Sequence, residues 1–252
     1  MKALITGASS GIGCEMAKVL SDMGYDLILV ARRKDRLDKL KESLKGNVEI
    51  ITADLSENKN CFELFDKVKD EDIDFVINNA GFGTFGEFTS VSLDRELEMI
   101  RVNSEAVHIL TSLFAGYFKD RKGNILNVAS IAGLMPGGPM LSTYYATKAY
   151  VLSLTLGLYE ELKKKNSPLK ISVLCPGPVD TEFNDVAGVK FALRGLDSAY
   201  VARYAIKKAL SGKTVIVPGI ITKIAMSLSH ICPRKLLLNF AYFAQYKKSV
   251  PK

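Results

Sequence analysis

Residues 2–13 read KALITGASSGIG, an apolar run that passes directly into a glycine-rich turn. The run predicts a buried strand over Lys2–Thr6, and the apolar spacing after the turn predicts a helix over 11–23. Glycines allow a tight turn and a close approach of the backbone, and the N-terminus of a helix attracts a pyrophosphate. The spacing is Gly-x-x-x-Gly-x-Gly rather than the Gly-x-Gly-x-x-Gly fingerprint. Its place between a strand and a helix predicts a dinucleotide-binding turn, with these residues at the cofactor: Gly7, Ser9, Ser10, Gly11, Ile12 and Gly13.

Short apolar runs alternate with longer helical patterns along the rest of the chain. The further predicted strands are Asp26–Ala31, Asn47–Thr52, Asp74–Asn78, Asn124–Ala129, Lys170–Cys175 and Thr214–Val217. They are almost continuously apolar, which indicates burial on both faces and therefore parallel pairing. The further predicted helices cover 33–45, 57–70, 93–119, 143–165 and 197–210. The alternation predicts an α/β fold: a doubly wound Rossmann-type parallel sheet of about seven strands with helices on both faces, in a single domain over residues 1–252.

The composition is that of a globular protein. Of the 252 residues, 48% are hydrophobic and 24% are charged. The net charge of +7 suits an anionic ligand, but no block of like charges indicates nucleic-acid binding. The four cysteines form no Cys-x-x-Cys pair, so we expect no disulfide framework, no metal site and a reducing, cytoplasmic location. The first strand leaves no room for a signal peptide, and no apolar run is long enough to span a bilayer.

Two arginines follow the second predicted strand, at Arg32 and Arg33. In dinucleotide folds an acidic residue near this point binds the ribose 2′-hydroxyl of NAD, whereas arginine accommodates the 2′-phosphate of NADP. The guanidinium fork matches the geometry of a phosphate. We therefore expect NADP(H) rather than NAD(H), with Arg32 as the main contact and Ser9 or Ser10 beside it. In the alternative, both arginines are solvated and Asp35 caps the next helix.

Polar and small residues follow the third and fourth predicted strands. Asp54, next to Leu55, can bond the adenine amino group, although it can equally cap a helix. The small residues after the fourth strand allow the chain to pass close to a cofactor. We expect cofactor contacts from Asp54, Leu55, Asn79, Ala80 and Gly81.

A tyrosine and a lysine lie four residues apart in the fifth predicted helix. The spacing of Tyr144 and Lys148 places both side chains on one helix face. A nearby ammonium lowers the pKa of a phenol, and a phenol tuned toward neutrality can act as a general acid or base. Ser130 follows the fifth predicted strand. Asn103 lies within a helical pattern where asparagine has poor propensity, so we expect it to bind water or backbone in the interior.

Five motifs occur in order: the glycine turn, Asn-Asn-Ala-Gly over 78–81, Ser130, the Tyr-x-x-x-Lys pair, and Pro-Gly-Pro-Val-Asp-Thr over 176–181. Together they resemble the short-chain dehydrogenase/reductase superfamily, in its compact form. The resemblance runs from residue 1 to about 181. One departure is the gap between Ser130 and Tyr144, which is one residue longer than the commonest spacing in that family.

The resemblance implies a set of roles. Tyr144 would be the general acid in reduction of a carbonyl and the base in oxidation of an alcohol. Lys148 would hold the nicotinamide ribose and depress the tyrosine pKa, and Ser130 would polarise the carbonyl. Asn103 would anchor a water that links Lys148 to bulk solvent. The nicotinamide side would be lined by Pro176, Gly177, Val179 and Thr181.

The two segments Ile131–Ser142 and Glu182–Leu196 do not fit the alternation, and both follow strands at the carboxyl edge of the sheet. We expect them to wall a substrate pocket, with 182–200 as a lid; ordinary surface loops are the alternative. Their apolar content favours an apolar ketone or aldehyde as substrate, contacted by Leu134, Met135, Met140, Phe183 and Phe191.

The apolar and basic tail over 220–252 has three interpretations: it closes the pocket, packs in a homo-oligomer, or lies on a membrane surface. The first two are favoured, and the family commonly forms homodimers and homotetramers. The tail resembles that of the family's general bacterial reductases and of its hydroxysteroid or long-chain ketoacyl members. Arg121 and Lys165 lie where 3-oxoacyl-carrier-protein reductases place basic contacts, so a 3-oxoacyl-thioester reductase and a hydroxysteroid dehydrogenase are alternatives.

Two hypotheses from other classes stay open. A non-catalytic NADP-binding redox sensor would not need the acid–base residues, and an oligomeric scaffold would leave the glycine turn unexplained. The sequence therefore favours an NADP(H)-dependent oxidoreductase acting on a small-molecule carbonyl or alcohol.

Overall fold

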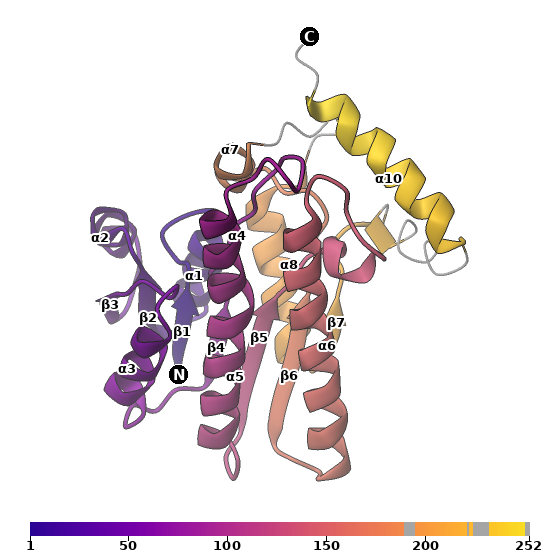
Figure 1. Ribbon diagram of the computed structural model, residues 1–252. Helices are drawn as coiled ribbons and strands as arrows, with labels where there is room; N and C mark the ends of the chain where they lie inside the picture. The colour runs from indigo at the N-terminus through magenta and orange to yellow at the C-terminus, as the bar shows by residue number, and fades with distance from the viewer. Residues whose placement is uncertain (189–194, 221, 224–231, 250–252) are drawn as a thin grey trace.

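A computed structural model describes residues 1–188, 195–220, 222–223 and 232–249. Seven strands form one sheet in the order β3-β2-β1-β4-β5-β6-β7, and every pair is parallel. The chain starts in the middle of the sheet, builds outward to β3, and returns to build the other half from β4 (Figure 1). The predicted doubly wound parallel sheet of seven strands is confirmed.

The element bounds agree with the predicted ranges to within a few residues. The strands are β1 (Lys2–Thr6), β2 (Asp26–Ala31), β3 (Val48–Thr52), β4 (Phe75–Asn78), β5 (Gly123–Val128), β6 (Leu169–Leu174) and β7 (Val215–Ile216). The helices are α1 (Gly11–Asp22), α2 (Lys34–Glu42), α3 (Asn58–Val68), α4 (Leu93–Ile100), α5 (Ala106–Tyr117), α6 (Ser142–Lys164), α7 (Phe183–Ala187), α8 (Ser198–Leu210) and α10 (Arg234–Ser249).

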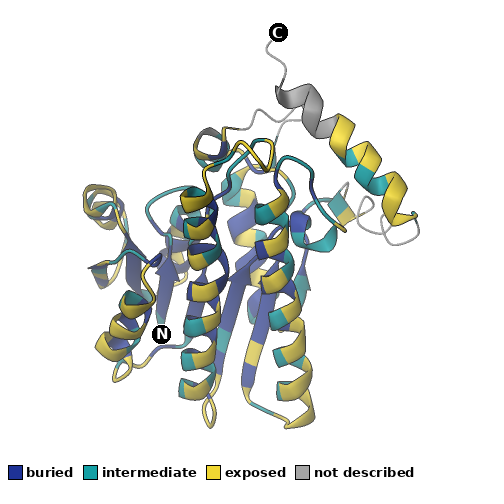
Figure 2. Cartoon of the chain, in the orientation of Figure 1, coloured by how far each residue is buried: buried dark blue, intermediate teal, exposed yellow. Residues whose placement is uncertain are grey.

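Helices cover both faces of the sheet because successive strand residues point to opposite sides. Ile5 of β1 packs into the core that α1, α2 and α8 close, whereas its neighbour Leu4 packs into the core that α3, α5 and α6 close. The strands are accordingly buried for the most part, with exposed residues at Glu49 and Thr52 of the edge strand β3 and at Lys170 of β6. The outer helix faces are exposed (Figure 2).

The fold differs from the predicted pattern in one predicted helix and in segments for which no helix was predicted, among them α7. The predicted helix over 93–119 is divided: a π-helical turn, η1 (Arg101–Glu105), separates α4 from α5. The tail, for which no helix was predicted, contains α10, which lies above the carboxyl edge of the sheet (Figure 1). A short 3-10 turn, η2 (Ile131–Leu134), follows β5. Phe191, which was predicted to contact the substrate, lies outside the described residues.

In the described part of the chain, no helix is long and apolar enough to cross a membrane. The described residues also contain no cluster of three or more side chains suited to a metal. All four cysteines are among the described residues, and none forms a disulfide.

Candidate active site

The glycine turn leads from β1 to α1 and packs against the residues after β4 so closely that a side chain would clash at Gly7 and Gly13. Gly7 and Gly11 have φ angles of 66° and 56°, which favour glycine. A Cβ at Gly13 would lie 2.4 Å from Asn79 Nδ2 and 2.5 Å from the carbonyl oxygen of Gly7. Asn79 Nδ2 in turn donates to the carbonyls of Thr6 and Gly7, at 3.0 and 3.1 Å. This cradle opens on the N-terminus of α1, and its shape fits a pyrophosphate.

Arg33 lies over this turn. Its Nη2 atom lies 3.2 Å from Ser9 Oγ and 3.0 Å from Ser10 Oγ. The same guanidinium meets both carboxylate oxygens of Glu182, at 3.1 Å each, and Arg36 donates to that carboxylate at 2.7 Å. Hydrogen bonds from Arg36 and Arg33 lower the pKa of Glu182 to about 2. The guanidiniums of Arg33 and Arg36 thus converge on one anionic group, and the two serine hydroxyls lie beside Arg33. Guanidinium and hydroxyl groups are donors that a phosphate can use.

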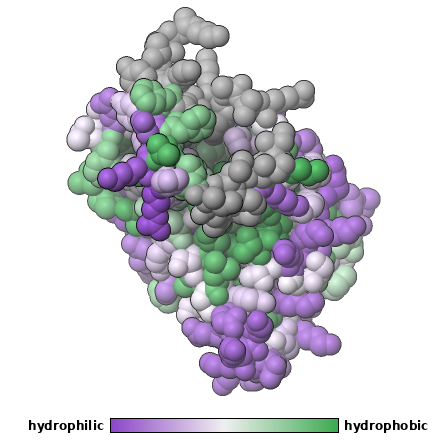
Figure 3. Space-filling view, turned by 90° about the vertical axis from the view of Figure 1, so that its right-hand side faces the viewer, coloured by the Kyte–Doolittle hydropathy of each residue, from purple (hydrophilic) through white to green (hydrophobic). Residues whose placement is uncertain are grey.

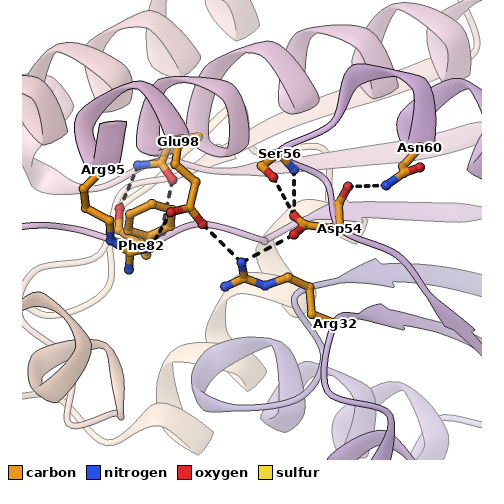
Figure 4. Close-up of polar contacts among 8 residues, drawn as sticks. Arg32, Asp54, Ser56, Asn60, Phe82, Arg95 and Glu98 are labelled. Carbon is orange, nitrogen blue, oxygen red and sulfur yellow. Dashed lines mark hydrogen bonds and ion pairs between the residues drawn. The ribbon is translucent and has the colours of Figure 1, made fainter. Parts of the chain in front are cut away.

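Arg32 points toward Asp54 and Glu98 (Figure 4). Its Nη1 atom lies 3.1 Å from Glu98 Oε1 and 3.6 Å from Asp54 Oδ2. Glu98 also accepts from Arg95, whose guanidinium lies 3.9 Å above the ring of Phe82. The expectation that Arg32 shares Ser9 or Ser10 is therefore wrong, because consecutive residues at the end of a strand point to opposite sides; Arg33 has that position.

Asp54 is held as a rigid acceptor after β3. Its Oδ1 atom accepts from the backbone and hydroxyl of Ser56, at 3.0 and 2.8 Å (Figure 4). Burial alone would raise the pKa of Asp54, but these bonds and the charge of Arg32 outweigh it and lower the pKa. Leu55 is buried in the core, so its backbone is the part that can reach a nucleotide.

Ser130, Tyr144 and Lys148 come together where β5 ends against α6. Ser130 caps the N-terminus of η2, and its Oγ accepts from the backbone N–H of Ala132 at 3.1 Å. The Nζ atom of Lys148 donates to the carbonyl oxygen of Val128 at 2.9 Å and lies 5.8 Å from the centre of the Tyr144 ring. The sequence spacing correctly predicted one helix face for the tyrosine and the lysine, both of which lie in α6.

The pKa of Tyr144 is shifted in the direction opposite to the expected one. Burial raises the pKa of Tyr144 to about 12, against a smaller opposite effect of hydrogen bonding with Ser130. Burial also lowers the pKa of Lys148 to about 8. The expected fall in the tyrosine pKa does not occur in this structure, because desolvation dominates and the ammonium is directed at Val128. Tyr144 is a neutral phenol here, with a proton to donate.

Asn103 lies in the π-helical turn and is fully buried. Its side chain accepts from the backbone N–H of Phe82 at 3.0 Å and donates to the Phe82 carbonyl at 2.8 Å. It also donates to Thr147 Oγ1, one residue before Lys148, at 3.2 Å. Asn103 thus fastens the segment after β4 to α6. The expected water relay stays a prediction.

The segment after β6 closes the remaining side of the cradle. A Cβ at Gly11 would lie 3.3 Å from Thr181, and Val179 forms a β-bridge with Leu196. The carbonyl of Pro176 accepts from the backbone of Ile131, which lies next to Ser130. This brings the motif over 176–181 between the glycine turn and the group formed by Ser130, Tyr144 and Lys148. Its contacts with the nicotinamide, Gly177 included, stay predictions.

Sequence reasoning missed three participants: Arg36, Glu98 and Glu182. Arg36 lies three residues after Arg33, and this spacing places both side chains on one helix face. The sequence could therefore have predicted that the two arginines act together. Glu182 directly follows the Pro-Gly-Pro-Val-Asp-Thr motif, but its partners are far away in sequence, at a separation of 149 residues for Arg33.

The family described as short chain dehydrogenase matches residues 1–189. The chain belongs to the short-chain dehydrogenase/reductase superfamily. Among curated relatives, an uncharacterized oxidoreductase of Staphylococcus epidermidis is 33% identical over 186 residues, covering 73% of this chain and 80% of that protein. Dehydrogenase/reductase SDR family member 11 of Bos taurus is 32% identical over 192 residues, covering 72% and 75%.

Solved structures of this superfamily have the same fold. A short-chain dehydrogenase from Sphingobium yanoikuyae in complex with NADPH superposes with a TM-score of 0.80 at 29% identity, covering 92% of this chain and 96% of that one. A superfamily member from Burkholderia phymatum in complex with NAD has a TM-score of 0.83 at 25% identity, covering 100% and 97%. The chain is thus an oxidoreductase of the class that acts on CH–OH groups with a nicotinamide dinucleotide.

Proposed function

We propose that this short-chain dehydrogenase/reductase uses NADP(H) to interconvert a carbonyl and a secondary alcohol, with Tyr144 as general acid in reduction and general base in oxidation. The observation that carries the proposal is the convergence of Tyr144, Ser130 and Lys148 at the carboxyl end of β5, beside the glycine cradle. Open α/β sheets bind their ligands at this edge.

The preference for NADP(H) over NAD(H) is supported by Arg33 and its neighbours. The guanidiniums of Arg33 and Arg36 converge on one anion, the carboxylate of Glu182. The hydroxyls of Ser9 and Ser10 lie beside Arg33. The 2′-phosphate of NADP(H) would accept hydrogen bonds from these guanidiniums and hydroxyls. The 2′-hydroxyl of NAD(H) carries no charge and would leave most of these donors without an anionic partner. The pyrophosphate would lie on the turn between Gly7 and Gly13.

The roles of the catalytic side chains follow from their protonation. The bound cofactor supplies or accepts the hydride. Tyr144 holds a proton to give to the developing alkoxide, and the hydroxyl of Ser130 polarises the carbonyl. Lys148, with its pKa lowered to about 8, changes its charge close to neutral pH and can bind the ribose hydroxyls in place of the Val128 carbonyl. Asn103 positions the segment after β4 relative to α6.

The substrate side favours an apolar ketone or aldehyde. The ring of Phe183 lies 5.5 Å from that of Tyr144, and Leu134 packs in the apolar cluster under η2. Leu238 of α10 meets Gly137, where an added Cβ would lie 3.2 Å from its Cδ2 atom. This contact supports the proposal that the tail over 220–252 closes the pocket. A lid over 182–200 and one domain over 1–252 stay predictions.

We also keep a homodimer or homotetramer and a cytoplasmic location as proposals. Apolar side chains gather in one area of the face on the β7 side (Figure 3). Leu236, Phe240 and Phe243 of α10 are exposed by 61%, 74% and 57%, and exposed apolar side chains that gather in one patch mark interaction sites.

The test is oxidation of NADPH, followed by its near-ultraviolet absorbance, against ketones, aldehydes, steroids and 3-oxoacyl thioesters. Turnover confined to one class supports the proposal and selects between the apolar-ketone, hydroxysteroid and thioester alternatives. Tight NADPH binding with no turnover on any class would favour the redox sensor instead.

A further inference from the structure

The carboxylate of Glu182 occupies the place that the proposed function assigns to a phosphate. Arg33 contacts it through two nitrogens and Arg36 through a third, at 3.1, 3.1 and 2.7 Å. A carboxylate and a phosphate monoester present the same recognition pattern to guanidinium groups. Two anions cannot share these donors, because like charges at such distances repel strongly.

The ion pairs of Glu182 are strong in geometry but open to solvent. The side chains of Glu182, Arg33 and Arg36 are exposed by 32%, 39% and 42%. Ion pairs at such positions contribute little free energy, since water screens them. A dianionic phosphate can therefore displace the carboxylate, which carries a single charge.

The neighbour of Glu182 lies at the catalytic tyrosine. Phe183 opens α7, and its ring lies 5.5 Å from that of Tyr144, at an interplanar angle of 52°. The tip of the ring meets Gly83, where an added Cβ would lie 2.8 Å from the Cζ atom of Phe183. Glu182, which contacts the arginines, is thus directly followed in the chain by Phe183, whose ring lies beside that of Tyr144.

We propose that Glu182 is a latch: its carboxylate competes with the 2′-phosphate of NADP(H) for Arg33 and Arg36, and its displacement moves Phe183 away from Tyr144. The inference rests on the proposed function, since it requires the phosphate to bind at Arg33. It makes Glu182 a determinant of cofactor affinity and couples cofactor binding to access at the catalytic group. The lowered pKa of Glu182, about 2, keeps the carboxylate charged throughout the neutral range.

The first test measures binding of adenosine 2′,5′-bisphosphate and of adenosine 5′-monophosphate by calorimetry. Glu182→Gln removes the carboxylate that competes for the arginines from a solvent-exposed position. We expect the affinity for the bisphosphate to rise by about threefold to fivefold and the affinity for the monophosphate to stay within about twofold of the wild type. Asp38→Asn is the matched control. It removes the same charge from α2, where Asp38 pairs with Lys34 and not with the arginines. We expect it to change neither affinity by more than about twofold.

The second test follows α7 directly. The chain has no tryptophan, so Phe183→Trp introduces a single fluorescent reporter of this segment. We expect its emission to change with the bisphosphate and to stay constant with the monophosphate. In the double variant with Glu182→Gln, the unliganded emission should already resemble that of the bisphosphate complex.

Distinct results overturn the latch and the phosphate assignment. If the wild type prefers the bisphosphate but Glu182→Gln leaves that affinity unchanged or weakens it, Glu182 does not compete and the latch is wrong. If the bisphosphate binds to the Phe183→Trp variant without changing its emission, the coupling to Tyr144 is wrong. If the wild type binds both nucleotides equally, the phosphate position itself is wrong, and the latch falls with it.

Discussion

The ammonium of Lys148 donates to the carbonyl oxygen of Val128, the last residue of β5, at 2.9 Å. Gly81, just after the end of the neighbouring strand β4, leaves the space that this ammonium needs. A Cβ at Gly81 would lie 3.3 Å from Lys148 Nζ and 2.9 Å from Asn103 Oδ1. The Val128 carbonyl at the end of β5 therefore holds the ammonium of Lys148, and the absence of a side chain at Gly81 leaves room for it.

Gly81→Ala should lower both stability and turnover. The added methyl has to push Asn103 or Lys148 aside, and overpacking of this kind costs about 1–3 kcal/mol. Urea denaturation and the turnover rate measure the two effects. Gly116→Ala is the control: nothing lies within 4 Å of its added Cβ, and alanine is the better helix former in α5. A Gly81→Ala protein as stable and active as the wild type would contradict the packing argument.

The buried lysine should make stability depend on pH. The pKa of Lys148 falls from 10.5 to about 8 on folding, so between these values the unfolded chain binds a proton that the folded chain has lost. Stability contributed by this residue therefore rises with pH across that window, by up to about 1.4 kcal/mol per pH unit. The pKa of Tyr144 rises from 10.0 to about 12, which acts in the opposite direction above pH 10.

Lys148→Met isolates the lysine, because it retains Tyr144 and fills a similar volume. We expect the free energy of unfolding of the wild type, minus that of the variant, to increase from about pH 8 to about pH 10. Urea titrations at several pH values measure the difference. A difference independent of pH would mean that the lysine keeps its ordinary pKa in the folded state.

Substitution of Arg33 and substitution of Arg32 should have different effects on the affinities for NADPH and NADH. Arg33→Ala removes hydrogen bonds to a charged phosphate, and we expect NADPH to bind about tenfold more weakly or worse, with NADH little changed. Arg32→Ala breaks the pairs with Glu98 and Asp54, which do not face the two serines, so NADPH and NADH should change alike. Fluorescence titration of the reduced cofactors measures both. A selective loss of NADPH binding in Arg32→Ala instead would reverse the assignment.

Local signals in the sequence predicted the sheet, its parallel pairing and the position of the glycine turn. Apolar continuity and strand length are properties of each segment alone, so β1 to β6 could be read from the chain. The π-helical turn at Asn103 was not predicted, because a turn of this kind has no strong local pattern; the poor propensity of asparagine only marked the place.

The sequence predicted which motifs form the site, but it did not predict which side chains those residues contact. Tyr144 and Lys148 follow from helical spacing, whereas the raised tyrosine pKa depends on burial that only the packed fold supplies. The different partners of Arg32 and Arg33 depend on which way each side chain leaves the end of β2. Glu182 was missed because its contacts with α2 exist only once β6 and β2 lie in one sheet.

The most direct measurement pairs NADPH binding with turnover in Tyr144→Phe and Tyr145→Phe. The two tyrosines are adjacent in α6, and one hydroxyl is lost in each variant. We predict that both variants bind NADPH within about twofold of the wild type, and that only Tyr144→Phe loses turnover, by about a hundredfold or more. Turnover by Tyr144→Phe close to that of the wild type would contradict the assignment of Tyr144 as the proton donor.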